Sequence, residues 1–351
     1  MKSGLSLMEM ATVLETQAKA KKDYVADTRR LKVEETSAGA LVLQGINGGD
    51  LPIRSTAHAQ FASSLGIPKV YYDRMLKDAP DLLARNVNTW LERQPSKKLV
   101  RTLSGEVRAV LSDSYRPLDN LDLAEAVMPQ LIGLEAKVMS SEVTESRFYL
   151  KAVTERVSGD VRLGDTLQAG LVVSNSEIGQ GSLRLEALDY RLVCLNGMIR
   201  EASVRQAHLG RGSRADAIED AREFFKSETR LADDRAFFLK VRDAVGSMFD
   251  AQRFQARLEE YRKADEKEVT GEPEAVVELV SRRFGFNDGE RSSVLKHFIK
   301  SDMPSAWGLA NAITRAAQDV ESYDRSYELE KLGGDVIELP ASAWREIATA
   351  K

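Results

Sequence analysis

The chain has 351 residues, of which 43% are hydrophobic and 30% are charged, and its formal net charge is −4. These values are typical of a soluble globular protein with one large domain or two units. The negative total excludes a polycation, so any surface that binds nucleic acid must be a local patch. Cys194 is the only cysteine, which excludes an internal disulfide and fits a reducing, cytoplasmic location. No run of about 18 apolar residues predicts a membrane span, and no signal peptide precedes the chain.

The N-terminal third alternates between short strands and helices. Val33 and Leu41 to Leu43 predict strands that are closed by a turn at Gly48 and Gly49. Capping residues and helix breakers then predict three helices, from Ser55 or Thr56 to near Gly66, from Pro68 to Leu76 and from Asp81 to Leu91. The turn near Gly66 resembles a helix-turn-helix, but Pro68 and two tyrosines favour a plain helical hairpin.

The middle of the chain changes to the period of β-strands. A two-strand hairpin is predicted at residues 99–111 around Ser104 and Gly105, and Asp119 or Asn120 can cap a helix from Leu121 to Leu131. Four further strands are predicted at residues 136–140, 148–154, 169–174 and 183–196. In the last of these strands the apolar phase changes, which predicts a β-bulge near Glu186 and Ala187. Asn196 and Gly197 form the strongest short hairpin signal in the chain.

The last third is helical. Apolar residues recur at helical spacing from Ile218 to Tyr261, and a break is expected near Gly246 or Asp250. A charged linker at residues 263–274 precedes more helices, the last ended by Gly333 and Gly334 before a short strand at residues 336–339. We therefore predict an α+β fold, with an antiparallel sheet from residues 98 to 205, N-terminal helices and a largely helical C-terminal region. The predicted domains are residues 1–94, 95–214 and 215–351.

A basic segment follows the predicted hairpin, and no acidic residue lies between Glu201 and Asp216. Arginine presents a planar fork that matches phosphate oxygens, so one interpretation is a loop that contacts phosphates. The other is a solvated loop that pairs with the acidic helix after it. The candidate phosphate contacts are Arg200, Arg205, His208, Arg211 and Arg214, and Tyr115 and Arg116 are candidates for stacking on bases or sugars.

Two polar turns are weaker candidates. The turn from Ser174 to Gly181 can hold a ligand through its amides, with Ser174, Asn175, Ser176, Glu177 and Gly179 as the candidate residues, although an ordinary hairpin loop is favoured. Asp113 and Asp119 can bind a metal, but a turn followed by a helix cap is favoured. Cys194 lies in the apolar phase of its strand, so core packing is favoured over a role as nucleophile. The sequence contains no nucleotide-binding or zinc motif, so we predict no catalytic residue, no metal and no cofactor.

Several segments together resemble a known family. They are NVNTWL at residues 86–91, LSDSYRPLDN at 111–120, VSNSEIGQGSLRLEALDYRLVCLNGMI at 173–199, the segment from His208 to Arg211, and WGLANAIT at 307–314. They resemble the phage/plasmid-like proteins that are grouped under a domain of unknown function in bacteriophages, prophages and conjugative plasmids. The resemblance covers roughly residues 50–340 and implies a protein of a mobile element, but no particular reaction.

The leading functional hypothesis is a nucleic-acid-binding protein of phage or plasmid origin that acts without nucleotide hydrolysis. Its expected partner is single-stranded nucleic acid, with annealing in recombination as the setting and a homo-oligomer as one form. The hairpins, basic segment and long helices are similar in architecture to ring-forming single-strand annealing proteins, although architecture alone assigns no function. Two alternatives remain. One is a protein-interaction module that binds a host factor, and the other is a metal-dependent enzyme that uses Asp113, Asp119 and Glu177.

Overall fold

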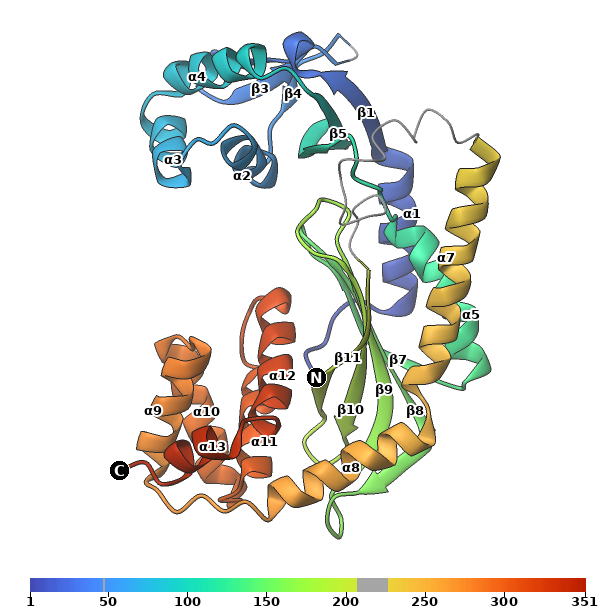
Figure 1. The fold of residues 1–351 in the computed structure, drawn as a ribbon, viewed down its shortest axis with the longest axis vertical. Helices are drawn as coiled ribbons and strands as arrows, with labels where there is room; N and C mark the ends of the chain where they lie inside the picture. The colour runs from blue at the N-terminus through green and yellow to red at the C-terminus, as the bar shows by residue number, and fades with distance from the viewer. Residues whose placement is uncertain (47, 207–226) are drawn as a thin grey trace.

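A computed structural model describes residues 1–46, 48–206 and 227–351, and its elements are arranged as an α+β fold (Figure 1). Its described strands form three antiparallel sheets, with the orders β1-β5-β6, β2-β3-β4 and β11-β10-β9-β8-β7. The predicted fold class is confirmed. No helix within the described ranges combines the length and the apolar character that a membrane span needs.

The first module combines the two small sheets with three helices. Its core contains Phe61 and Tyr72 from the helices and Val33, Val100 and Val107 from the strands. Its strands are β1 (Lys21–Asp27), β2 (Lys32–Glu35), β3 (Leu41–Gln44), β4 (Leu51–Pro52), β5 (Lys97–Leu103) and β6 (Glu106–Ser112). Its helices are η1 (Thr28–Arg30), α2 (Ser55–Ser64), α3 (Lys69–Asp78) and α4 (Pro80–Arg93), and α1 (Leu7–Ala20) connects it to the larger sheet.

The hairpin predicted at residues 99–111 forms, and Ser104 and Gly105 both take the positive φ that its tight turn needs. It does not join the larger sheet, as the sequence prediction had it. Instead β5 pairs with β1, which lies more than 70 residues earlier in the chain. Sequence periodicity cannot reveal which distant strand a hairpin will select.

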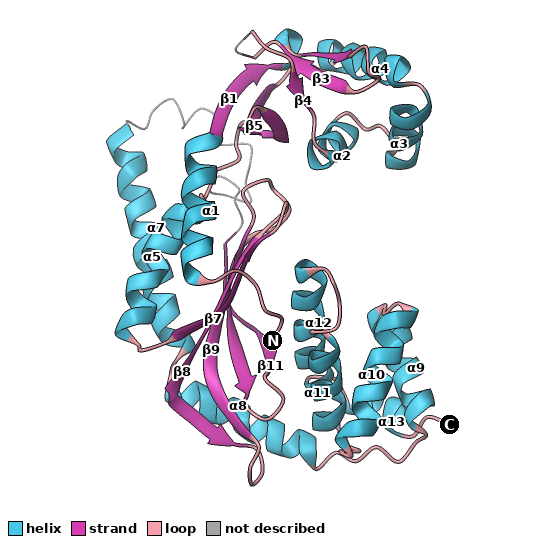
Figure 2. Ribbon diagram, turned by 180° about the vertical axis from the view of Figure 1, so that it is seen from behind, coloured by secondary structure: helices cyan, strands magenta, loops and turns pink. Residues whose placement is uncertain are grey.

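The five-stranded sheet is covered by helices on both faces (Figure 2). One face packs against α5 and α7, and the other packs against α12 through the cluster that contains Tyr149, Leu188 and Tyr327. Every residue of β10 except Arg184 is buried. The elements of this part are α5 (Asn120–Gly133), β7 (Lys137–Val143), β8 (Phe148–Asp160), β9 (Thr166–Asn175), β10 (Leu183–Arg191) and β11 (Asn196–Gln206).

Burial on both faces explains the phase change in β10, because apolar residues of either phase are shielded from water. Leu183 and Leu185 belong to the larger core, and Leu188 and Tyr190 to the core beside α12. A register shift does occur between Leu185 and Ala187, as predicted, but the extra residues lie in β11. The pairing of β10 with β9 is continuous.

The turn predicted at Asn196 and Gly197 is wrong. Strand β10 ends at Arg191, the connecting turn occupies residues 192–195, and Asn196 already pairs with Arg191 in β11. The Asn196 side chain is instead buried against Thr314. Gly197 gives Leu188 room, since a Cβ at this position would lie 2.6 Å from Leu188 Cδ1. Cys194 is a half-buried residue of the turn and does not lie in the core, as the sequence prediction had it.

The C-terminal region is helical. The predicted break is confirmed at Asp250, whose side chain caps α8 by accepting a hydrogen bond from Arg253 N. Gly333 and Gly334 do not end a helix, and no strand forms at residues 336–339, because α12 continues through both positions. The helices are α7 (Ser227–Met248), α8 (Ala251–Asp265), α9 (Pro273–Phe284), α10 (Asp288–Ser301), α11 (Ala306–Ala316), α12 (Tyr323–Ile337) and α13 (Ala341–Ala348).

Candidate functional site

The two polar turns singled out in the sequence meet in the structure. Tyr115 Oη donates a hydrogen bond of 3.0 Å to the backbone oxygen of Ser176. Asn175 Nδ2 donates to Leu118 O at 2.9 Å and to Asn120 Oδ1 at 2.8 Å. The loop between β9 and β10 is folded on itself, because Ser176 Oγ accepts a hydrogen bond from Gln180 N at 3.1 Å. These contacts join segments about 60 residues apart, and we call the place where they meet the junction.

Glu177 is the carboxylate at the centre of the junction. Its Oε1 accepts a hydrogen bond of 2.7 Å from Asn120 N, at the start of α5, and its Oε2 accepts one from Arg108 Nη2. The N-terminus of a helix favours negative charge. Asp119 is the N-cap residue of α5 but makes no capping hydrogen bond with its side chain. The predicted cap is therefore supplied by a residue from another segment.

Asp119 is occupied by two cations. Lys21 Nζ lies 2.5 Å from Asp119 Oδ2, and Arg101 Nη2 donates to Asp119 Oδ1 at 2.9 Å. Burial alone would raise the pKa of Asp119, but the hydrogen bonds from Lys21 and Arg101 outweigh it and lower the pKa. The carboxyl is therefore held in its charged form.

Arg101 is fully buried and connects three segments. Besides Asp119, its guanidinium donates to Asp23 Oδ1 at 2.8 Å and to the backbone oxygen of Glu177 at 2.7 Å. Burial by itself lowers the pKa of Arg101, but Asp23 and Asp119 raise it by more. The junction thus ties β1, β5, α5 and the loop after β9 together through a charged group that has no contact with water.

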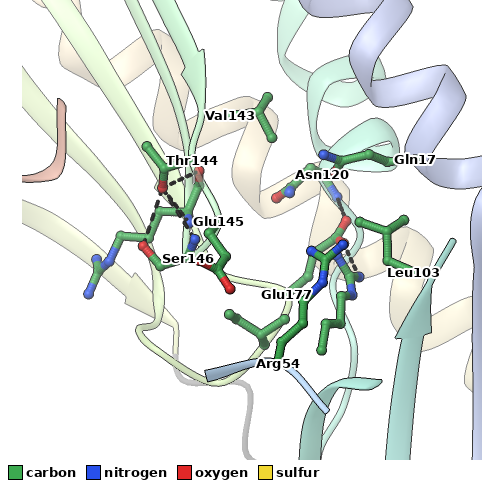
Figure 3. A pocket seen from close by; sticks show the side chains of 12 residues that line it. Gln17, Arg54, Leu103, Asn120, Val143, Thr144, Glu145, Ser146 and Glu177 are labelled. Atoms are coloured by element: carbon green, nitrogen blue, oxygen red, sulfur yellow. Dashed lines mark hydrogen bonds and ion pairs between the residues drawn. The ribbon is translucent and has the colours of Figure 1, made fainter. Parts of the chain in front are cut away.

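A small cleft of about 40 Å³ opens at the edge of the junction. Thr144, Glu145 and Ser146, from the turn between β7 and β8, lie on one side, and Arg54, Asn120 and Glu177 lie on the other (Figure 3). The wall is completed by Gln17, Leu103, Arg108, Val143, Arg147 and Ile178.

Among the candidate loop residues, Ser174, Asn175, Ser176 and Glu177 are buried, and Gly179 is exposed. The loop is therefore not the ordinary solvated hairpin loop that we favoured, since most of it is enclosed by the junction. Tyr115 is also buried, with its hydroxyl on Ser176, which argues against stacking on a base. Arg116 is half-buried and is not free.

Arg200 lies inside the protein. Its guanidinium is 8% exposed and contacts Glu260 at 2.6 Å and Glu338 at 2.8 Å. This pairing argues against the predicted phosphate contact at Arg200, because a buried arginine held by two carboxylates cannot reach a polyanion. Arg205 belongs to β11, the edge strand of the sheet. His208, Arg211 and Arg214 lie outside the described residues.

The proposed metal ligands Asp113, Asp119 and Glu177 do not form a metal site. Over the described ranges, no group of three or more histidine, cysteine, aspartate or glutamate side chains is arranged to hold a metal ion. Asp119 and Glu177 each face cations instead, and Asp113 is exposed on the turn before α5.

A cluster of cations that sequence analysis missed lies at one end of the first module, and we call it the basic corner. It consists of Arg29, Arg30, Arg93, Lys97 and Lys98, all exposed except for the half-buried Lys98. Thr28 N donates to Ser96 O at 2.9 Å, which places η1 beside the start of β5.

The charge of the basic corner is only partly neutralised. Asp27 pairs with Arg29. Within the part of the chain that the structure describes, the other four cations have no carboxylate partner within 4.0 Å. The signal was hidden because residues 29–30 and 93–98 are brought together only by the pairing of β1 with β5.

Comparison with protein families gives one match. The profile described as "Domain of unknown function (DUF932)" matches residues 107–332. The match contains both turns of the junction, whereas the basic corner precedes it. No curated protein and no solved structure is significantly similar to the chain.

Proposed function

The chain belongs to the DUF932 family, whose profile covers more than half of it, and from this premise we propose that it binds single-stranded nucleic acid on the basic corner. The proposed activity is binding and annealing of strands, without nucleotide hydrolysis. The observation that carries the proposal is the exposed cluster of Arg29, Arg30, Arg93, Lys97 and Lys98, of which four have no carboxylate partner in the described structure.

Such a cluster suits a phosphate backbone, because unpaired exposed cations release condensed counterions from the strand when they bind it. Trp90 lies on α4, one turn before Arg93, and is half-buried. Aromatic rings next to cations are the usual way in which single strands are held without reading their sequence. Arg205 in β11 remains a candidate for a second contact.

We also propose that the protein belongs to a phage, prophage or plasmid. The motifs around the junction and at residues 307–314 support this, because they resemble the phage/plasmid-like proteins. Annealing of single strands during recombination is a task that such elements share.

The test is fluorescence anisotropy with a labelled single-stranded oligonucleotide over a range of salt concentrations. The variant Arg93→Ala/Lys97→Ala should lower the slope of log K against log salt by about 1.4, at about 0.7 for each phosphate contact on a single strand. The matched control is Lys69→Ala/Arg85→Ala, which removes two exposed cations that already pair with Asp73 and Asp81. An unchanged slope in the first variant would contradict the proposal.

A second candidate function, binding to a host protein, is favoured by the turn between β10 and β11. Leu192, Val193 and Leu195 are 39%, 59% and 57% exposed there. Neighbouring apolar side chains in solvent often mark a protein interface. A partner that is captured from nuclease-treated lysate by the wild type, and lost with Val193→Asp, would support this function.

A further inference from the structure

The cleft beside the junction carries an inference that does not depend on the basic corner. We propose that it binds one small tetrahedral oxyanion of the phosphate class between Arg54, Arg108 and Arg147. The cleft holds about 40 Å³, and one water needs roughly 10–15 Å³ on the same kind of measure. The space therefore matches about three waters or a single oxyanion.

Arg108 is the main anchor of the proposed site. Its side chain is only 8% exposed, and Nη2 donates to Glu177. Its Nε is buried and has no hydrogen-bond partner among the described residues. A buried donor without an acceptor is costly, and native proteins rarely leave one unless a ligand or an ordered water completes it. An oxyanion in the cleft supplies the missing acceptor.

Arg54 and Arg147 add donors from two other segments. Arg54 Nε donates to Glu106 Oε2 at 2.6 Å, at the rim of the first module. Arg147 Nη2 donates to the backbone oxygen of Gln180 at 2.5 Å, and no carboxylate lies within 4.0 Å of it in the described structure. Gly181 permits this position, because a Cβ there would lie 2.7 Å from Arg147 Nη2.

The carboxylates near the cleft are already engaged. Glu177 is matched by Arg108 and by the N-terminus of α5, and Glu106 is matched by Arg54. Glu145 is exposed, so its charge is screened by water. Arg147 is left as the uncompensated cation of the cleft. Planar guanidinium groups that converge from different segments are the usual means of holding a phosphate group.

The experiment is calorimetric titration of the full chain with inorganic phosphate, in a buffer that contains no phosphate. Arg147→Gln removes the uncompensated cation, and Arg108→Lys keeps a charge opposite Glu177 but removes the Nε donor. Each variant should weaken phosphate binding by about tenfold or more, the effect of one lost charge-assisted hydrogen bond. The matched control is Arg156→Gln, an exposed arginine that pairs with Glu135 and should leave binding unchanged.

Thermal unfolding of each variant without phosphate shows that it is folded. The proposal is overturned if the wild type shows no saturable binding of phosphate, or if both variants bind it as tightly as the wild type. Competition with oligonucleotides identifies the source of the oxyanion. Displacement of phosphate by a 5′-phosphorylated strand, and not by a 5′-hydroxyl strand, assigns the end of a polynucleotide. Phosphate binding without displacement by either strand assigns the free ion. Neither result depends on the Arg93→Ala/Lys97→Ala variant.

Discussion

Arg101 shows how one residue can hold distant segments together. It has no contact with water, and its three hydrogen bonds reach Asp23, Asp119 and the backbone of Glu177. Removing one partner of a buried ion pair leaves the other charge without compensation, and this is far more costly than losing an exposed pair.

We expect Arg101→Met to lower the free energy of unfolding by about 3–5 kcal/mol, because Asp119 and Asp23 would lose a shared partner. Urea denaturation followed by circular dichroism measures the change. Arg85→Met is the control, since Arg85 forms an exposed pair with Asp81 and should cost under about 1 kcal/mol. A similar loss for both variants would show that the burial of Arg101 has no energetic consequence.

His58 gives the first module a dependence on pH. Its Nδ1 lies 2.8 Å from Tyr72 Oη, and burial, with Lys69 nearby, lowers the pKa of His58 from 6.5 to about 4. The unfolded chain therefore binds a proton between pH 6.5 and pH 4 that the folded chain does not bind. The stabilisation from neutral His58 is complete above pH 6.5 and is lost as the pH falls through this window.

From this we expect the free energy of unfolding to fall by about 2 kcal/mol more between pH 7 and pH 5 in the wild type than in His58→Gln. Urea denaturation at both pH values gives the two differences. If the two proteins lose equal stability, the proton is taken up elsewhere.

The elements pack closely where glycines allow it, and α12 is the clearest example. A Cβ at Gly333 would come closer than 3.0 Å to Thr314 of α11, and one at Gly334 would meet the backbone oxygen of Ile199 in β11. The glycine pair thus brings α12 against a helix and a strand at once. This reason for a glycine is absent from local sequence, where the pair looks like the end of a helix.

Gly333→Ala should destabilise the protein by about 1–3 kcal/mol, because α11 and α12 must move apart to admit the methyl group. Gly246→Ala in α7 is the matched control, as a Cβ there meets nothing within 4 Å. That change should raise stability by about 0.5–1 kcal/mol, through better helix propensity. Thermal unfolding of both variants provides the comparison, and a stabilised Gly333→Ala would contradict the packing argument.

Local patterns predicted most elements but few of their partners. The helices at residues 55–64 and 80–93 and the hairpin at residues 97–112 were recognisable because caps, breakers and periodicity act within a few residues. The pairing of β1 with β5 and the burial of β10 on both faces depend on contacts far apart in the chain. For the same reason the sequence indicated both turns of the junction but missed their meeting, and it missed the basic corner altogether.

At the scale of the whole molecule, the junction connects two hydrophobic cores. One contains Phe61 and Tyr72 in the first module, and the other surrounds the large sheet. Between them run the contacts of Arg101 with Asp119 and of Arg108 with Glu177. Cooperative unfolding of the two cores depends on such contacts, because each core is large enough to be stable by itself.

We expect Glu177→Gln to separate the unfolding of the two cores, since it leaves Arg108 without its carboxylate and takes the negative charge from the start of α5. Differential scanning calorimetry should show one transition for the wild type and two for the variant. Glu135→Gln, at an exposed pair with Arg156, is the control and should keep one transition. A single unshifted transition in Glu177→Gln would mean that the cores are coupled by other contacts.

The central position of β9 has a consequence for hydrogen–deuterium exchange. This strand has a hydrogen-bonded neighbour on each side, and helices cover the sheet above and below it. No local opening can expose its amides, so their protons should exchange last, at a rate set by the rarest and most complete excursions of the chain. The amides of β1, at the rim of a small sheet, should exchange much earlier.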